Sequence, residues 1–226
     1  MKTGIFGGTF NPIHYGHLRT AEELRYRLGL DRIIFIPAGT PPLKRAELVP
    51  AAHRLAMTCL AVEKNSGFLV SAIEINREEC SYTVNTIREL RALYPEDELL
   101  LILGIDAFLD IPLWWQPDEL LAMVDFAVVT RPGFDIAEIL KSPYIQQKGQ
   151  GARGKGQENI SEPWTLKGGR RLFTVPVTPL GISSTAIRAL IREGKSIRYL
   201  LPEAVAEYIA GHGLYRQAIT KSRLIL

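Results

Sequence analysis

The chain has 226 residues, 46% of them hydrophobic and 23% charged, which is typical of a globular protein with a sizeable core and excludes a disordered or fibrous chain. No window approaches the ~18 uninterrupted apolar residues of a membrane-spanning helix, and the N-terminus has no signal-peptide pattern. We therefore expect a cytoplasmic protein with no membrane partner. The two cysteines, Cys59 and Cys80, lack metal-ligand spacing, so they exclude a zinc ribbon or disulfide framework and are expected to be buried thiols.

The formal net charge of +3 is concentrated in one segment. Six of the 27 basic residues and two of the 24 acidic residues fall within residues 145–171, which leaves 21 basic and 22 acidic residues elsewhere. A body this close to neutral shows no basic groove for nucleic acid. We therefore expect no nucleic-acid partner.

Strand-like apolar runs alternate with helical patterns along most of the chain. In chain order, the expected elements are a strand (2–6), a helix (16–28), a strand (32–37), a helix (51–63), a strand (68–71), a helix (83–93), three strands (98–103, 126–130 and 172–175) and two helices (183–193 and 203–210). The run Arg32–Pro37 (RIIFIP), for example, is β-branched and aromatic, as in buried strands. The alternation predicts a single α/β domain over residues 1–216, with a doubly wound parallel sheet and helices on both faces.

Two segments depart from this pattern. Residues 145–169 contain six glycines and four glutamines, and they show no periodic apolar face that could be buried. We expect a flexible surface insertion there. Residues 217–226 are expected to form a loosely held tail.

The segment after the first expected strand, GGTFNPIHYGH (residues 7–17), is the most informative for function. In an open parallel sheet, ligands bind beyond the carboxyl ends of the strands. The adjacent glycines Gly7 and Gly8 allow a ligand close to the backbone, and a helix N-terminus attracts an anion. His14 and His17 are three residues apart, so both imidazoles can point at a bound phosphate. Taken singly, each histidine could instead cap or pack.

A second segment near the C-terminus, ISSTAIR (residues 182–188), suits the same chemistry. Its hydroxyls and amides can bind a polyphosphate at a helix start, and Arg188 stands one turn beyond Ser184, where its forked cation reaches the same oxygens. The alternative, that the hydroxyls are simply helix caps, remains open. Two such segments at one edge of a sheet favour an anion site more strongly than either alone.

Together, the two segments resemble the paired signature of the nucleotidyltransferase superfamily, an H-x-G-H motif after the first strand and an I-S-S-T-x-x-R motif near the C-terminus. From Met1 to about Arg216, the sequence resembles the bacterial nicotinate-nucleotide adenylyltransferases. The supporting segments are Ser81-Tyr82-Thr83, Gly104-Ile105-Asp106, Pro112-Leu113-Trp114 and Arg131-Pro132-Gly133. One departure is Asn11, where that family more often has aspartate.

The resemblance implies a Rossmann-like fold and adenylyl transfer from ATP to nicotinate mononucleotide, which yields nicotinate adenine dinucleotide and pyrophosphate in NAD biosynthesis. Mg²⁺ is expected to arrive with ATP, because the sequence has no direct metal motif. The implied catalytic residues are His14, His17, Lys44 and Arg188. The implied ATP-binding residues are Gly7, Gly8, Thr9, Phe10, Gly104, Asp106, Ile182, Ser183, Ser184 and Thr185. The residues implied to bind nicotinate mononucleotide are Tyr82, Thr83, Trp114 and Arg131.

Several alternatives stay open at this point. The acceptor could be phosphopantetheine or another substrate of a related nucleotidyltransferase, and a non-catalytic nucleotide-binding module is a further alternative. Lys44 and Arg131 could be ordinary surface cations, and Asp106 could be a turn or cap residue. The sequence does not separate nicotinate from nicotinamide mononucleotide, decide which of Trp114 and Trp115 stacks on the pyridine ring, or fix the oligomeric state.

Overall fold

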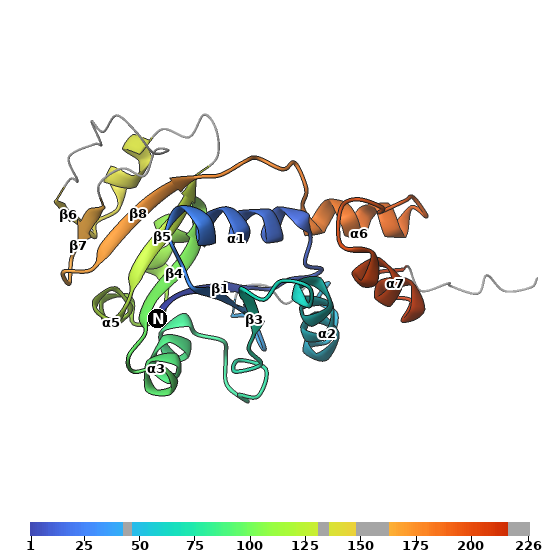
Figure 1. The fold of residues 1–226 in the computed structure, drawn as a ribbon, viewed down its shortest axis with the longest axis horizontal. Coiled ribbons are helices and arrows are strands. Elements are labelled where there is room, and N and C mark those ends of the chain that lie inside the picture. Colours follow the sequence, from blue (N-terminus) through green and yellow to red (C-terminus); the bar gives the residue numbers. More distant parts are fainter. Residues whose placement is uncertain (43–46, 131–135, 148–162, 217–226) are drawn as a thin grey trace, which may run out of the picture.

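The strands form one sheet in the computed structural model, which describes residues 1–42, 47–130, 136–147 and 163–216. Among these residues the sheet has eight strands in the order β3-β2-β1-β4-β5-β8-β7-β6 (Figure 1). The strands are β1 (Lys2–Gly8), β2 (Arg32–Pro37), β3 (Phe68–Val70), β4 (Glu98–Gly104), β5 (Asp125–Thr130), β6 (Ile145–Gln147), β7 (Trp164–Leu166) and β8 (Arg171–Pro176). All six strands predicted from the sequence are present and pair in parallel.

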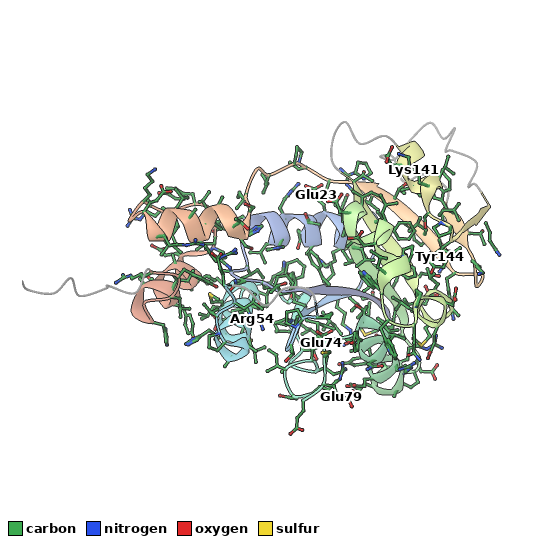
Figure 2. All side chains as sticks on the ribbon, turned by 180° about the vertical axis from the view of Figure 1, so that it is seen from behind. Glu23, Arg54, Glu74, Glu79, Lys141 and Tyr144 are labelled. Carbon is green, nitrogen blue, oxygen red and sulfur yellow. The ribbon has the colours of Figure 1, made fainter. Side chains whose placement is uncertain are left out.

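The helices cover both faces of the sheet, as predicted (Figures 1 and 2). They are α1 (Tyr15–Arg27), α2 (Ala51–Val62), α3 (Thr83–Leu93), α4 (Ile105–Leu109), α5 (Pro117–Met123), α6 (Ser184–Arg192) and α7 (Glu203–Gly211), with 3₁₀ turns η1 (Ile111–Leu113) and η2 (Ile136–Lys141). Buried side chains of α1, α2, α6 and α7 share one core layer, and those of α3, α4 and α5 share the other. The short helices α4 and α5 and the two 3₁₀ turns were not predicted, because such short elements show too little of the helical period.

The strand sequences explain why the sheet has two buried faces. Along β4, Leu99, Leu101 and Leu103 pack into the core layer of α3 and α5. Leu100 and Ile102, which alternate with them, pack into the layer of α1 and α2. A strand covered on both sides needs apolar residues at every position, which is why it is a continuous apolar run.

Residues 145–169 were predicted to form a flexible insertion, but both ends of this segment contain a strand. Strands β6 and β7 are antiparallel to each other, and β7 is antiparallel to β8, so the sheet is mixed rather than wholly parallel. Trp164 and Leu166 are 4% and 0% exposed, and they supply the buried face that we did not expect. Their alternation spans only three residues and is hidden among glycines and glutamines. Residues 148–162 of the predicted insertion and the predicted tail, 217–226, lie outside the described residues.

The prediction that both cysteines are buried is wrong. Cys59 is exposed and Cys80 is half-buried. Cys59 is exposed because α2 buries Met57, Thr58 and Val62, and Cys59 lies outside that buried stripe.

Within the described ranges, no helix is long and apolar enough to cross a membrane.

Candidate active site

The predicted site lies where the strand order reverses, between β1 and β4. The chain leaves β1 toward α1 on one face of the sheet and leaves β4 toward α4 on the other. In open α/β sheets, nucleotides bind outside the carboxyl ends of the strands at such a reversal. Gly7 and Gly104 are exposed there, and no described atom lies within 4 Å of where a Cβ would stand at either residue. The backbone is therefore open to a ligand.

The two predicted histidines lie against each other at the start of α1. Their rings stack with centroids 3.7 Å apart, and the backbone N–H of His14 donates to Nδ1 of His17 at 3.2 Å. A neutral imidazole that accepts at Nδ1 carries its proton at Nε2. His17 is thus both a helix cap and a potential N–H donor from Nε2, so the capping alternative and the phosphate alternative are compatible.

Both imidazoles are neutral at physiological pH. Burial lowers the pKa of His14 to about 4, and burial together with the neighbouring His14 lowers the pKa of His17 to about 3. The Phe10 ring packs edge-on against His17, with centroids 5.2 Å apart. Nδ1 of His14 is buried and has no hydrogen-bond partner within the described part of the chain. Such an atom can accept a hydrogen bond from a water or from a ligand.

The C-terminal motif contacts the N-terminal one directly. Oγ of Ser183 caps α6 by accepting the Ala186 N–H at 3.1 Å. Oγ of Ser184 donates to the carbonyl of Pro12 at 2.8 Å, and Arg188 donates to the carbonyl of Asn11 at 3.0 Å. Segments more than 170 residues apart in the sequence therefore lie side by side. The hydroxyl of Thr185 lies 3.5 Å from a terminal nitrogen of Arg188.

A cavity of about 230 Å³ lies beside Arg188. It is lined by Glu47, Leu48, Val49, Arg188, Arg192, Tyr215 and Arg216. The Glu47 carboxylate lies between two arginines, 3.3 Å from Arg188 and 3.0 Å from Arg192. Hydrogen bonds from Arg188 first, and the charge of Arg192 next, hold the pKa of this carboxyl below its ordinary value. Nε of Arg188 is buried and has no partner among the described residues.

Asn11, the departure from the family pattern, is 4% exposed and makes three hydrogen bonds through its side chain. Its Nδ2 donates to the Glu47 carbonyl at 2.9 Å, while its Oδ1 accepts from the Tyr215 hydroxyl at 2.9 Å and from the Val49 N–H at 3.4 Å. An aspartate could accept these last two bonds but could not donate the first. Asn11 therefore links the segment after β1 to the turn before α2.

Two of the four residues predicted to bind the acceptor, Tyr82 and Thr83, lie at the start of α3. Tyr82 is the N-cap of that helix and Thr83 is its first residue. Paired bonds between Ser81 and Thr40, at 2.9 and 3.1 Å, hold this segment to the loop after β2. The Tyr82 ring faces Trp115, with centroids 5.7 Å apart, whereas Trp114 packs partly buried against the core. The structure therefore pairs Tyr82 with the tryptophan that the sequence analysis did not select.

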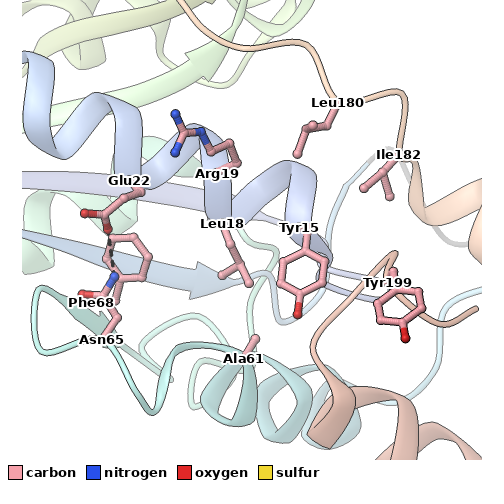
Figure 3. Close-up of a pocket in the computed structure, with 10 residues that line it drawn as sticks. All are labelled: Tyr15, Leu18, Arg19, Glu22, Ala61, Asn65, Phe68, Leu180, Ile182 and Tyr199. Atoms are coloured by element: carbon pink, nitrogen blue, oxygen red, sulfur yellow. Dashed lines mark hydrogen bonds between the residues drawn. The ribbon is translucent and has the colours of Figure 1, made fainter.

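The remaining predicted residues are scattered or not described. Asp106 is exposed in the first turn of α4. The Ile182 side chain lines a separate cavity of about 560 Å³ bounded by α1 and the end of α2, together with Tyr15 and Leu180 (Figure 3). Lys44 and Arg131 lie outside the described residues. No group of three or more potential metal ligands occurs in the parts of the chain that the structure describes.

Sequence reasoning missed Glu47, Arg54 and Tyr215, which all contact this site. Only Arg54 leaves a signal in the sequence, because an arginine lies within an otherwise apolar helical stripe (AAHRLAMTCLAV). Glu47 and Tyr215 fall in irregular segments, where residue type alone does not indicate a partner.

Comparison with known proteins identifies the class to which this fold and site belong. Residues 5–190 match the family model described as Cytidylyltransferase-like, which places the chain among α/β nucleotidyltransferases. It is 43% identical to "Probable nicotinate-nucleotide adenylyltransferase" of Geobacter sulfurreducens over 95% of this chain and 98% of that protein. It is 44% identical to the protein of the same name from Desulfitobacterium hafniense (strain Y51), over 95% and 96%. The chain belongs to the cytidylyltransferase-like family and, within it, to the nicotinate-nucleotide adenylyltransferases.

A solved structure shares the fold. "Plasmodium falciparum nicotinic acid mononucleotide adenylyltransferase complexed with NaAD" superposes with a TM-score of 0.71, at 19% identity, over 95% of this chain and 98% of that one. The prediction of a Rossmann-like fold is confirmed.

Proposed function

We propose that this protein, acting as one domain over residues 1–216, transfers the adenylyl group of ATP to nicotinate mononucleotide, releasing nicotinate adenine dinucleotide and pyrophosphate in NAD biosynthesis. The observation that carries the proposal is that Arg188 binds the same segment after β1 that carries the stacked histidine pair, at the point where the strand order reverses. The names of the relatives and the dinucleotide in the solved structure support the same substrates.

The chemistry follows from the donors at this edge of the sheet. The phosphate of the mononucleotide attacks the α-phosphorus of ATP in line, and pyrophosphate leaves, so no covalent enzyme intermediate is needed. Catalysis then consists of positioning two anions and stabilising the charge that spreads over the transferred group. Nε2–H of His17 and the ring of His14 supply hydrogen bonds to the phosphates without adding charge, and Arg188 supplies a cation.

The remaining roles are assigned by position in the site. The backbone of residues 7–10 and Gly104 lines the ATP phosphates, and the start of α6 (Ile182–Thr185) holds the β- and γ-phosphates with Arg188. Lys44 and Arg131 are assigned to phosphates on the resemblance alone. The N-terminus of α3, at Tyr82 and Thr83, faces the nicotinate carboxylate, because helix N-termini favour anions. Trp114 is assigned to the pyridine ring.

We infer that Mg²⁺ enters with the triphosphate. Mg²⁺ binds substrate phosphates and waters with one or two carboxylates rather than a protein cage. Exposed Asp106, at the carboxyl end of β4, is the carboxylate placed to help hold it. Once bound, the cation would neutralise charge on the leaving pyrophosphate.

Pyrophosphate release tests the proposed substrates. With ATP, we expect turnover of nicotinate mononucleotide, measured beside nicotinamide mononucleotide and phosphopantetheine. Turnover of phosphopantetheine alone would show that the acceptor is wrong.

In the same assay, Trp114→Ala is expected to raise the KM for the mononucleotide while leaving the KM for ATP unchanged. If Trp115→Ala does so instead, the aromatic partner of Tyr82 is the one that stacks on the pyridine ring.

We expect ATP to compete with the Glu47 carboxylate for two arginines. This carboxylate forms ion pairs with Arg188 and Arg192, so a phosphate of ATP must displace it in order to bind these arginines. We expect Glu47→Gln to lower the KM for ATP roughly two- to fivefold, as for loss of exposed ion pairs, and the difference to shrink at high salt. Steady-state kinetics measures both effects. Glu193→Gln, which removes an exposed carboxylate paired with Lys195, is the matched control. A raised KM in Glu47→Gln would contradict the prediction.

A further inference from the structure

Arg54 of α2 is buried, and the charge of the buried Glu74 carboxyl only partly offsets the cost of burying the guanidinium. The side chain is 1% exposed, and within the described ranges no carboxylate lies at ion-pair distance from it. Burial lowers the pKa of the guanidinium, which nevertheless stays charged because an arginine loses its proton only at extreme pH. A buried cation is unfavourable, and an apolar side chain of similar volume is often at least as stabilising. Stability alone therefore does not account for an arginine here.

The guanidinium instead joins three backbone segments at the carboxyl edge of the sheet. It donates to the carbonyl of Thr9 at 2.9 Å, after β1, and to that of Gly39 at 3.0 Å, after β2. Nε donates to the carbonyl of Val49 at 3.2 Å, in the turn before α2. Gly39 leaves little space in this region, because a Cβ there would stand 2.1 Å from the carbonyl oxygen of Glu74.

The bond to Thr9 reaches His17 through Phe10. A trans peptide is planar, so holding the Thr9 carbonyl also orients the N–H of Phe10. Phe10 has a φ of 46°, a left-handed conformation that is unfavourable for an aromatic residue unless its surroundings hold it. Its ring is 2% exposed and packs edge-on against the imidazole of His17. The chain of contacts therefore runs from Arg54 through the Thr9–Phe10 peptide to a predicted catalytic group.

We propose that Arg54 is a positioning residue for adenylyl transfer: its bond to Thr9 holds Phe10 against His17, which keeps water from the imidazole and holds that ring in place. Among the described residues, the hydrogen bonds that its guanidinium donates all end on backbone carbonyls, so it acts through other residues. The proposal rests on the proposed function only for its effect on turnover.

Arg54→Lys is the most direct test. Lysine keeps the charge, but one ammonium group cannot reproduce a planar fork spread over three carbonyls. We expect NMR titration of the free protein to show the His17 pKa rising by more than one unit, from about 3 toward its ordinary value near 6.5, as water reaches the ring. We also expect kcat to fall by about 10²-fold, as for a displaced catalytic group, with a smaller change in the KM for ATP.

Met57→Ala is the matched control, because Met57 lies one turn along the same helix and is fully buried in the core. It is expected to lower Tm without changing the titration of His17. Wild-type titration and kcat in Arg54→Lys would overturn the proposal. If that variant does not fold, Phe10→Leu is the alternative test, because it removes the aromatic ring that packs against His17. An unchanged His17 pKa in Phe10→Leu would also overturn the proposal. The titration uses no substrate, so its result is independent of whether the acceptor assignment is right.

Discussion

Replacing His17 with alanine is expected to lower kcat/KM by roughly 30- to 1000-fold, which corresponds to ~2–4 kcal/mol of lost transition-state stabilisation. The reason is the orientation of the ring. Its Nδ1 accepts the backbone N–H of His14, so Nε2–H is the donor that remains for a phosphate oxygen. Because the pKa of about 3 keeps this imidazole neutral, the activity should show no inflection near pH 6.5 from its protonation.

A matched pair of variants separates the donor from the helix cap. In His17→Gln, the amide nitrogen stands near the position of Nε2, whereas in His17→Asn it stands near Nδ1. We expect the glutamine variant to keep more activity than the asparagine variant in a pyrophosphate-release assay. Circular dichroism and Tm report the cap, whose loss destabilises by about 1 kcal/mol. Equal activity in both variants, or near-normal rates in the alanine variant, would remove the proposed role of His17.

Arg188→Ala is expected to have an effect of similar size, again ~2–4 kcal/mol in kcat/KM. The guanidinium is largely buried against the segment after β1, where it donates to the Asn11 carbonyl. Its Nη2 donates to the Glu47 carboxylate, so a phosphate that displaces Glu47 would accept this hydrogen bond. We expect both a raised KM for ATP and a lowered kcat, because the phosphates are held before and during transfer.

Two comparisons make the Arg188 prediction specific. Arg188→Lys keeps the charge but loses the fork, so it should recover only part of the activity. Arg192→Ala removes the other arginine bound to Glu47, which is more exposed, and we expect a smaller effect on the KM for ATP and little on kcat. If Arg192→Ala is as damaging as Arg188→Ala, the phosphate contact has been assigned to the wrong arginine.

Long periodic segments made most of the fold predictable. β4 is an uninterrupted apolar run, and α3 and α6 repeat apolar residues at the helical period, so both patterns could be recognised without tertiary information. The antiparallel strands β6 and β7 could not, because three residues carry too little pattern. Trp164 becomes a strand residue only because β8 offers it an edge with which to pair.

The candidate site was also only partly predictable from the sequence. His14, His17 and Arg188 could be named from their spacing within short motifs. The residues that hold them could not, because their partners are far away in the sequence. Asn11 bonds to Tyr215 across 204 positions, and Arg54 bonds to Thr9 across 45. Glu47 was equally hidden, since only the packing of α6 beside the turn before α2 brings its carboxylate to two arginines.

The sequence by itself determined the α/β class, the order of the main elements and the residue types that can bind a triphosphate, because these depend on local periodicity and on the chemistry of single side chains. Only the tertiary structure decided which groups are neutral, which carbonyls Arg54 joins, and which tryptophan faces Tyr82. The physical reason is that burial and hydrogen-bond geometry depend on neighbours in space. Those neighbours come from strands and helices whose contacts no short stretch of sequence specifies.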